Sequence, residues 1–252
     1  MRKLLLYLTV FVFIFSIYSQ DAENKKRGYI SALKGDAQKR KADEYRWLEA
    51  KLRMDVESRD ILRTLPESFA EIALKKGSRI RLAPKTIVNM VKLYEETENK
   101  LITKMKVQKG EIWGNVRDKG EREVFEFEST AISSSVVGTE FRIQTHKKGS
   151  KIKVYRGQVE VKGVIKKEAT NKDKKEDIKI KKPDEIEGPT EIEGPKEVTM
   201  EEWTLIVKEM MELEVNKDGE IVKYRSINTK REDDDSEWYR WNKERDKELI
   251  IK

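Results

Sequence analysis

The feature that most constrains the fold is a series of short stretches in which apolar and polar residues alternate. Between residues 69 and 161 they form about nine runs, separated by Gly, Pro or charged turns at roughly the 8–12-residue spacing of sandwich-like or barrel-like folds. Side chains two residues apart share one face of a strand. The connections are too short for helical crossovers. The sequence therefore predicts a mainly β fold, an antiparallel β-sandwich or β-roll.

The composition changes after residue 163. Residues 164–198 are dominated by Lys and Glu, and they contain Glu-Ile-Glu-Gly-Pro twice, at residues 185–189 and 191–195. Two copies of a six-residue unit are too few for a solenoid. A charged linker with two Gly-Pro turns is therefore the prediction for residues 164–198.

Residues 199–252 are predicted to form a mainly helical C-terminal segment. Thr199 and Glu202 have the spacing of a capping box, and the following apolar residues fit a helical period over residues 200–214: Trp203, Ile206, Val207, Met210 and Leu213. A short strand is expected at Ile221–Tyr224. A last helix containing Trp238 and Trp241 is expected to end the sequence.

The charge pattern argues against nucleic-acid binding. Charged residues make up 40% of the 252 residues and hydrophobic residues 37%, with a net charge of +7. Acidic and basic residues are mixed along the chain, whereas nucleic-acid binders concentrate basic residues on one face. We interpret the charges as a solvated surface and expect no nucleic-acid partner. Attraction to anionic surfaces such as lipid head groups or acidic polymers is the alternative.

The first 19 residues have the pattern of a signal peptide. Arg2 and Lys3 precede an apolar run of 15 residues, Leu4–Tyr18, which is shorter than the ~20 residues that cross a membrane. Cleavage after Ser19 would export the chain to the periplasm or the medium of a bacterium, and the absence of cysteine fits a bacterial envelope. The alternative is an uncleaved N-terminal anchor. Membrane contact is otherwise expected only through a partner.

No residue pattern indicates catalysis. The single histidine, His146, lies in a turn rich in Lys and Gly, and Ser133–Ser135 lacks the G-x-S-x-G pattern of serine nucleophiles. The acidic run Asp233–Asp235 lacks the spacing of a calcium loop, and no phosphate-binding glycine motif occurs. We therefore predict a protein that is not an enzyme and has no cofactor or metal. A glycosidase that uses paired carboxylates is a minor alternative.

Residues 128–163 resemble the core motif of the FecR domain family. Val136-Val137-Gly138-Thr139-Glu140-Phe141 resembles the family's V-x-G-T-x-F, and Gly157-Gln158-Val159-Glu160-Val161 resembles G-x-V-x-V. Upstream, four further pieces resemble the family pattern: Gly35-Asp36 with Trp47, Asp60–Thr64, Gly77–Leu82 and Gly110–Trp113. The resemblance covers residues 29–163 and implies a FecR-like β-domain over that range.

The resemblance also identifies a structural motif: Gly138, Thr139, Phe141, Gly157 and Trp47. We expect Gly138 to allow a bend, Thr139 to hydrogen-bond locally at that bend, and Phe141 to enter the core. A structural role is favoured over a ligand site. The resemblance further favours strand and turn pieces around Trp47 over one helix across residues 43–57.

Two departures from the family pattern bear on function. Val137 stands where many members have arginine, and no proline accompanies Ser129 or Thr130. Members that regulate sigma factors have a cytoplasmic segment before their membrane helix, whereas only two charged residues precede the apolar run here. We therefore expect an exported binding or scaffold protein whose partner is an envelope protein or a polysaccharide. The alternative is an extracytoplasmic signalling module that relays a state to a membrane partner.

Overall fold

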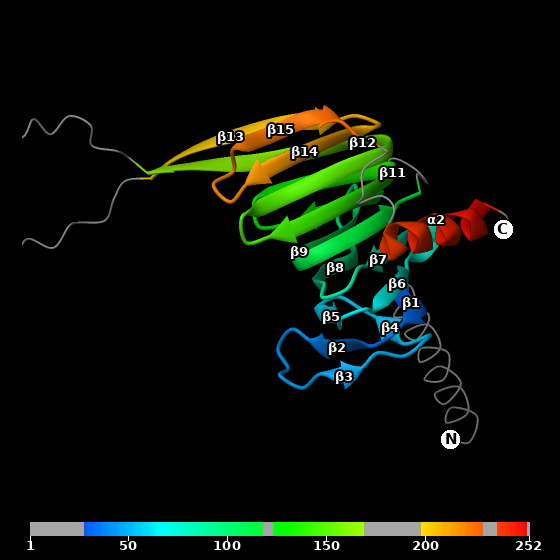
Figure 1. The fold of residues 1–252 in the computed structure, drawn as a ribbon. Helices are drawn as coiled ribbons and strands as arrows, with labels where there is room; N and C mark the ends of the chain where they lie inside the picture. Colours follow the sequence, from blue (N-terminus) through cyan, green and yellow to red (C-terminus); the bar gives the residue numbers. More distant parts are fainter. Residues whose placement is uncertain (1–27, 118–122, 169–197, 229–235, 251–252) are drawn as a thin grey trace, which may run out of the picture.

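The computed structural model describes residues 28–117, 123–168, 198–228 and 236–250, which form one mixed β-sheet, a short 3-10 helix, η1 (Lys75–Gly77), and one α-helix, α2 (Glu237–Ile250) (Figure 1). The predicted mainly β fold is confirmed. The leader, the Glu-Ile-Glu-Gly-Pro copies and the Asp233–Asp235 run lie outside the described residues. Within the described ranges, no helix has the length and apolar character needed to cross a membrane.

Fifteen strands make up the sheet: β1 (Gly28–Lys34), β2 (Ala37–Lys41), β3 (Leu48–Glu49), β4 (Asp55–Val56), β5 (Asp60–Thr64), β6 (Phe69–Ala73), β7 (Arg79–Leu82), β8 (Ile87–Glu96), β9 (Leu101–Asn115), β10 (Glu123–Glu128), β11 (Ile132–His146), β12 (Gly149–Glu168), β13 (Val198–Val207), β14 (Met211–Asn216) and β15 (Ile221–Ser226). The pairings are antiparallel except that of β9 with β10, as the short connections predict. The region around Trp47 contains the two-residue strands β3 and β4 and no helix, which confirms the strand-and-turn prediction.

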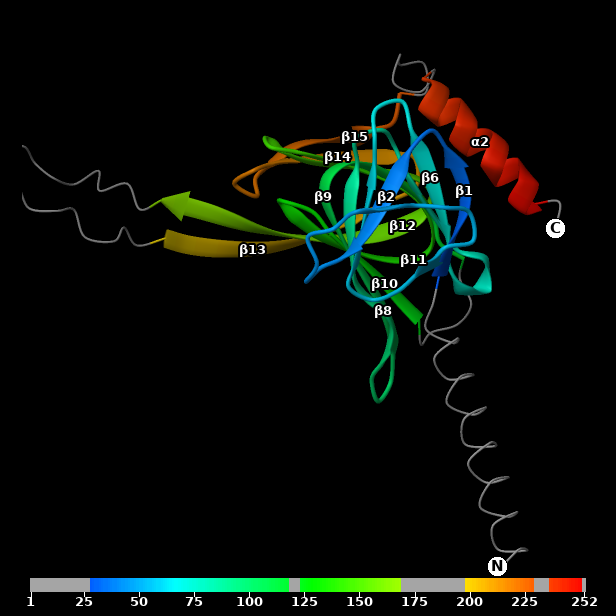
Figure 2. The ribbon, with the colours of Figure 1, turned by 90° about the horizontal axis from the view of Figure 1, so that it is seen from below.

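The hairpin of β11 and β12 bends in its middle, where the register shifts between Val137 and Glu140. Before this bulge β11 pairs with β10, and after it β11 pairs with β9. Likewise β12 pairs with β14 in its first part and with β13 in its second. Strands that pass from one layer to another through a bulge are typical of the corners of packed sheets. The bend thus folds the part of the sheet that contains β10 and β13 against the part that contains β14 and the end of β9. Figure 2 shows the strands from below.

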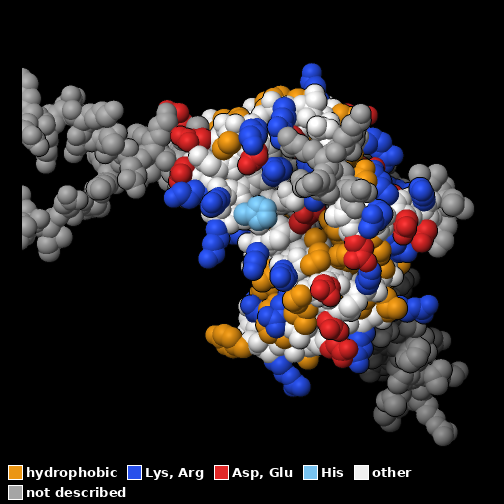
Figure 3. Space-filling model, viewed as in Figure 1, with side chains coloured by type: hydrophobic (Ala, Val, Ile, Leu, Met, Phe, Trp, Pro, Cys, Tyr) orange, Lys and Arg blue, Asp and Glu red, His pale blue; other side chains and the backbone are white. Residues whose placement is uncertain are grey.

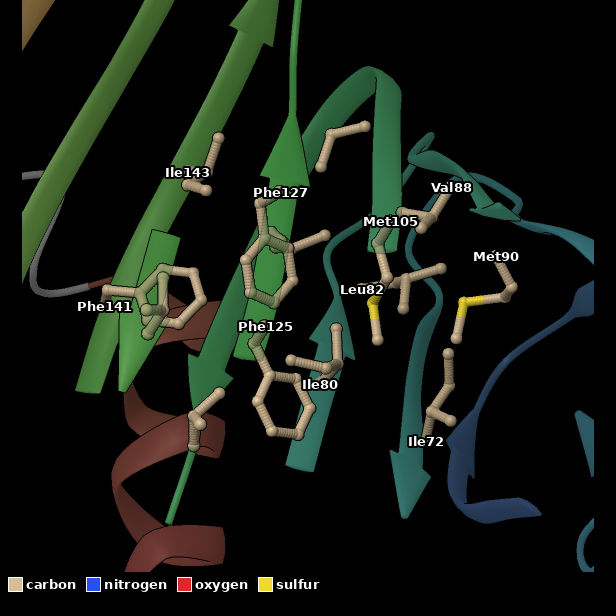
Figure 4. Close-up of a cluster of buried hydrophobic side chains, with 14 of the residues drawn as sticks. Ile72, Ile80, Leu82, Val88, Met90, Met105, Phe125, Phe127, Phe141 and Ile143 are labelled. Atoms are coloured by element: carbon tan, nitrogen blue, oxygen red, sulfur yellow. The ribbon is translucent and has the colours of Figure 1, made fainter. Parts of the chain in front are cut away.

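The hydrophobic core lies between the folded parts of the sheet and continues beneath β6–β8 (Figure 4). Its apolar side chains come from alternate positions of the strands, as the period of two requires. Phe127 and Phe141 meet edge to face, with ring centroids 4.9 Å apart. Phe141 and Ile143 are both fully buried, as predicted for Phe141.

The structure contradicts the predicted helix over residues 200–214. That stretch forms β13 and β14, which pair with the two parts of β12. Trp203, Leu205 and Val207 turn inward in alternation with exposed neighbours, so the period is two. Pairing with the otherwise open edge of β12 outweighs the local helical preference, since propensity is weaker than tertiary context.

The predicted boundaries of the charged linker also need correction. β12 extends to Glu168, and its last residues pair with the start of β13 at Val198, so both ends of the predicted linker are strand. The predicted short strand at Ile221–Tyr224 is confirmed as the first part of β15. The predicted last helix is confirmed as α2, which contains Trp238 and Trp241.

Candidate binding surface

The Gly-Thr motif forms the corner of the β11–β12 hairpin. Gly138 and Gly157 have positive φ angles of 59° and 83°, which glycine adopts without strain. The Thr139 hydroxyl donates to the carbonyl oxygens of Val137, at 2.7 Å, and Gln158, at 3.0 Å. Thr139 is fully buried. The motif therefore fixes the bend that joins the two parts of the sheet, and the predicted bend and local hydrogen bond are confirmed.

Phe141 and Trp47 also have structural surroundings. A Cβ atom on Gly114 would collide with the Phe141 ring, so a glycine is needed opposite this side chain. Two guanidinium groups contact the Trp47 ring, with Arg63 Cζ 3.9 Å and Arg40 Cζ 5.0 Å from the ring centroid. These cation–π contacts occupy the ring. The structure does not bring Trp47 together with the Gly-Thr motif, since it lies on a separate part of the sheet.

The residues considered for catalysis are dispersed. His146 is exposed at the end of β11, beside the turn to β12. Ser133, Ser134 and Ser135 form part of β11, where Ser134 is buried and its neighbours are partly exposed. Within the described ranges, no group of acidic and histidine side chains could hold a metal ion.

Helix α2 covers the outer face of β6, β7, β9 and β11 (Figure 1). Trp238 packs against Phe69, with centroids 5.3 Å apart, and stacks with Trp241 at 5.6 Å. Tyr239 meets the edge of Trp113 at 5.7 Å. A second, aromatic cluster therefore attaches the helix to the side of the sheet that faces away from the main core.

Charged side chains of the sheet are also buried beneath α2. Arg81 bonds Glu71 through Nε at 2.7 Å and Asp246 of the helix through Nη1 at 2.8 Å. Arg245 of the helix reaches Glu71 at 2.8 Å. Burial alone would raise the pKa of the Glu71 carboxyl, but the hydrogen bonds and charges of Arg245 and Arg81 lower it to about 2. Each buried charge thus has a partner on the sheet or on the helix.

A second charged group lies farther along the same face. Arg142 and Glu111 form a bidentate pair, and Gln144 donates to the same carboxylate at 2.6 Å. The Trp238 indole N–H also donates to Glu111. Burial opposes the charge of Arg142, yet the carboxylate of Glu111 raises the pKa of the guanidinium. Helix α2 therefore supplies partners to both charged groups on this face.

At β15, one end of the strand order, the sheet has an open edge among the described strands. β15 pairs with β14 alone among the described strands, so its outer edge has unpaired backbone groups. Five of the ten exposed large apolar side chains in the described residues lie on it or beside it: Ile206, Met210, Ile221, Val222 and Tyr224. We call these five residues, together with strand β15, the β15 edge. Figure 3 shows hydrophobic side chains among basic ones along the upper margin, where Figure 1 places β13 and β15.

The β15 edge is held in position by the strands behind it. Leu213 of β14, which is fully buried, pairs with Tyr224, and the Tyr224 hydroxyl lies 3.4 Å from the carbonyl oxygen of Ile206. Val222 is 51% exposed. The strand therefore presents exposed apolar side chains and is uncovered within the described structure, which is typical of an interaction surface.

A cavity of 350 Å³ adjoins this surface, between the β10–β11 turn and the β14–β15 turn. Trp203 forms one wall, and its indole N–H donates to the carbonyl oxygen of Gly219 at 2.7 Å. Thr130, Lys162 and Lys217 are among the polar residues that line it. An aromatic wall with polar groups around it could accept a small polar ligand such as a sugar.

Reasoning from the sequence missed the β15 edge as a site, although it predicted the strand. The available signal was the adjacent apolar pair Ile221 and Val222 within the predicted strand. Both are exposed in the structure, and the register between β14 and β15 shifts between Ile221 and Lys223. Tyr45, Leu48 and Leu52 form a smaller exposed apolar group on the loops around β3.

A family model described as FecR protein matches residues 60–160. Two crystal structures of a proposed anti-sigma factor from Parabacteroides distasonis, at 1.65 Å and 2.50 Å resolution, resemble the chain with 16% sequence identity and a TM-score of 0.42. Each match covers 67% of this chain and 60% of the other. A TM-score at this level does not establish a common fold. No curated protein matches the sequence.

Proposed function

We propose that this chain, whose residues 60–160 match the FecR protein family model, is a non-enzymatic binding or scaffold module outside the cytoplasm. In this proposal an extended segment of an envelope protein adds to the sheet at the β15 edge. The observation that carries it is an edge strand that pairs on one side only among the described strands and has exposed apolar side chains. Strand addition uses such an edge, because main-chain bonds give affinity and alternate side chains give specificity.

Binding is favoured over catalysis by the residues available. The sequence contains no cysteine and one histidine, and that histidine is exposed at a strand end. The Gly-Thr motif that carries the family resemblance maintains a bend in the sheet. Variation at the open edge would therefore change the partner without disturbing the fold.

The proposed location outside the cytoplasm is supported by the basic and apolar leader in the sequence. N-terminal sequencing of the protein from cells tests it. A terminus at Gln20 is expected for a cleaved signal peptide. A terminus at Met1 in a membrane fraction would support the anchored alternative, and in that case a signalling module that acts on a membrane partner becomes the better description.

A polysaccharide is the second candidate ligand, and the cavity beside Trp203 favours it. Glycan arrays probed with the wild-type chain and with Trp203→Leu would test this alternative. Binding that is lost with Trp203→Leu supports a glycan site at the cavity. Arrays that stay blank for both proteins reject it.

Capture experiments on envelope extract test strand addition at the β15 edge. Tyr224→Lys replaces an apolar side chain of this edge by a charged one. Tyr45→Lys makes the same change at a tyrosine that is 98% exposed on a distant loop. We expect wild type and Tyr45→Lys to retain the same envelope protein and Tyr224→Lys to lose it. Equal capture by all three proteins would refute the β15 edge as the binding surface.

A further inference from the structure

Two rows of charged residues cross the last three strands toward the β15 edge. In one row Lys151 of β12 pairs with Glu214 of β14, which pairs with Lys223 of β15. The nitrogen–oxygen distances are 3.6 Å for Lys151–Glu214 and 3.8 Å for Lys223–Glu214. The signs of the charges therefore alternate from strand to strand along this row.

The second row runs beside the first and has the same order of charges. Lys153 of β12 pairs in register with Glu212, and Glu212 pairs with Arg225 of β15, to which it forms an ion pair. Both rows thus end on a basic residue at the open edge. The Lys223 side chain is 50% exposed, so its charge can still attract an acidic group on a further strand.

The residue between these two cations faces the other side of the sheet. Tyr224 lies opposite the buried Leu213 and beside β13. A residue placed opposite Tyr224 on a further strand would meet the aromatic ring at the margin of the core. Aromatic and aliphatic cross-strand pairs stabilise such contacts.

We propose that the β15 edge recognises an extended protein segment with the pattern acidic–apolar–acidic. This inference rests on the proposed strand addition and specifies the chemistry of the partner. The two acidic residues continue the charge rows at Lys223 and Arg225, and the apolar residue between them lies opposite Tyr224. The pattern reads the same in both directions, so it fits parallel and antiparallel addition equally.

A second copy of β15 is a poorer occupant. Antiparallel self-pairing centred on Lys223 would bring it opposite Lys223 of the other copy, and pairing centred on Tyr224 would bring Lys223 opposite Arg225. Like charges directly opposite each other destabilise a sheet. Basic residues on an edge strand discourage such association. The same residues attract an acidic strand, so they make the edge selective as well as protected.

The sequence itself supplies a suitable probe, because Glu-Ile-Glu occurs at residues 185–187 and 191–193. A labelled synthetic peptide with the sequence of residues 183–195 is titrated against the full chain by fluorescence anisotropy. The matched control peptide has lysine in place of its four Glu-Ile-Glu glutamates. We expect the acidic peptide to bind at least about tenfold more tightly than the lysine peptide, since two cross-strand charge pairs change sign between them.

The double variant Lys223→Glu with Arg225→Glu provides the reciprocal test. We expect it to lose the acidic peptide and to gain the lysine peptide, a reversal that unfolding could not produce. Circular dichroism melting confirms that the variant is folded. An unchanged preference for the acidic peptide, or no binding of either peptide to wild type, would overturn the acidic–apolar–acidic rule.

One further variant tests whether the chain's own Glu-Ile-Glu residues compete with an external partner for the β15 edge. It carries Gln in place of Glu185, Glu187, Glu191 and Glu193. If wild type and this variant bind the acidic peptide equally, the site is open to an external partner as proposed. If only the variant binds it, the chain's own segment competes for the edge, and the assignment to a partner is wrong.

The outcomes also separate this inference from the proposed function. The envelope capture is repeated with the charge-reversed double variant. Capture that is lost with Tyr224→Lys but retained by the double variant leaves strand addition standing and rejects the acidic pattern. Capture that survives both changes rejects strand addition at the β15 edge as well.

Discussion

The outer face under α2 and the β15 edge belong to the same sheet, and both present rows of charged side chains. Under α2 the charged side chains have partners that the chain supplies: Arg81 pairs with Glu71 on the sheet and with Asp246 on the helix. At the β15 edge the rows end on Lys223 and Arg225 with no further strand in the described structure. A charge row that ends at an open strand, rather than charge itself, therefore indicates where a partner can add.

The largest expected difference between the two regions concerns single basic residues. Arg81→Ala leaves Glu71 and Asp246 without their shared partner in a buried site, so we expect the free energy of unfolding to fall by about 3 kcal/mol or more. Lys223→Ala removes a half-exposed ion pair and should cost less than about 1 kcal/mol. Urea denaturation of both variants measures this difference. Equal costs would mean that the covered and open rows are energetically alike.

Removing aromatic side chains should give a similar contrast. Trp238 is buried against Phe69 and Trp241, so Trp238→Ala should cost about 3 kcal/mol. Tyr224→Ala, at an exposed position, should cost about 1 kcal/mol or less. Thermal melting followed by circular dichroism measures both. A small effect of Trp238→Ala would show that α2 contributes little to stability.

Acid should weaken the covered face selectively through Glu71. Its pKa is about 2 in the folded chain against an ordinary value of 4.5, so the folded state favours the ionised form. The resulting stabilisation, about 3 kcal/mol, is fully present above pH 4.5 and is lost as the pH falls toward 2. The check is the unfolding free energy of wild type and Glu71→Gln between pH 7 and pH 3. The variant should lose less stability over this range, and parallel curves would contradict the account.

The corner of the β11–β12 hairpin should respond more modestly. Gly157 has a positive φ angle, and a Cβ atom there would lie 3.0 Å from the carbonyl oxygen of Gly138. We expect Gly157→Ala to lower the unfolding free energy by about 1–2 kcal/mol through backbone strain. Gly219→Ala, also at a positive φ but in the turn before β15, is the matched control. A larger loss at Gly219 would mean that the hairpin corner is not the more constrained site.

The sequence predicted the strands of residues 69–161 because each strand turns one face toward the core, so that its apolar and polar residues alternate. It also predicted the bend at Gly138 and the hydrogen bond of Thr139, since both depend on local backbone geometry. The prediction was wrong for β13, where Trp203, Ile206 and Val207 fit a helical period. Trp203, Leu205 and Val207 also fit a period of two, and only the adjacent edge of β12 decides between the two.

The candidate site could not be predicted in the same way. The charge rows that end at Lys223 and Arg225 join residues from β12, β14 and β15, which are more than 70 residues apart at their extremes. Their alignment depends on strand register, and register follows from the folded sheet rather than from any local pattern. The partners of Arg81 on α2 are distant in sequence for the same reason.

Hydrogen–deuterium exchange on the full chain, with and without the acidic peptide, shows whether a strand adds to the sheet at the β15 edge. If the β15 edge takes up an added strand, backbone amides within residues 221–226 should exchange more slowly when the peptide is present, because the outer edge of β15 gains hydrogen-bond partners. Residues 44–52, which include the other exposed apolar group, should exchange at an unchanged rate. Slowed exchange in residues 44–52 with no change in residues 221–226 would contradict the account.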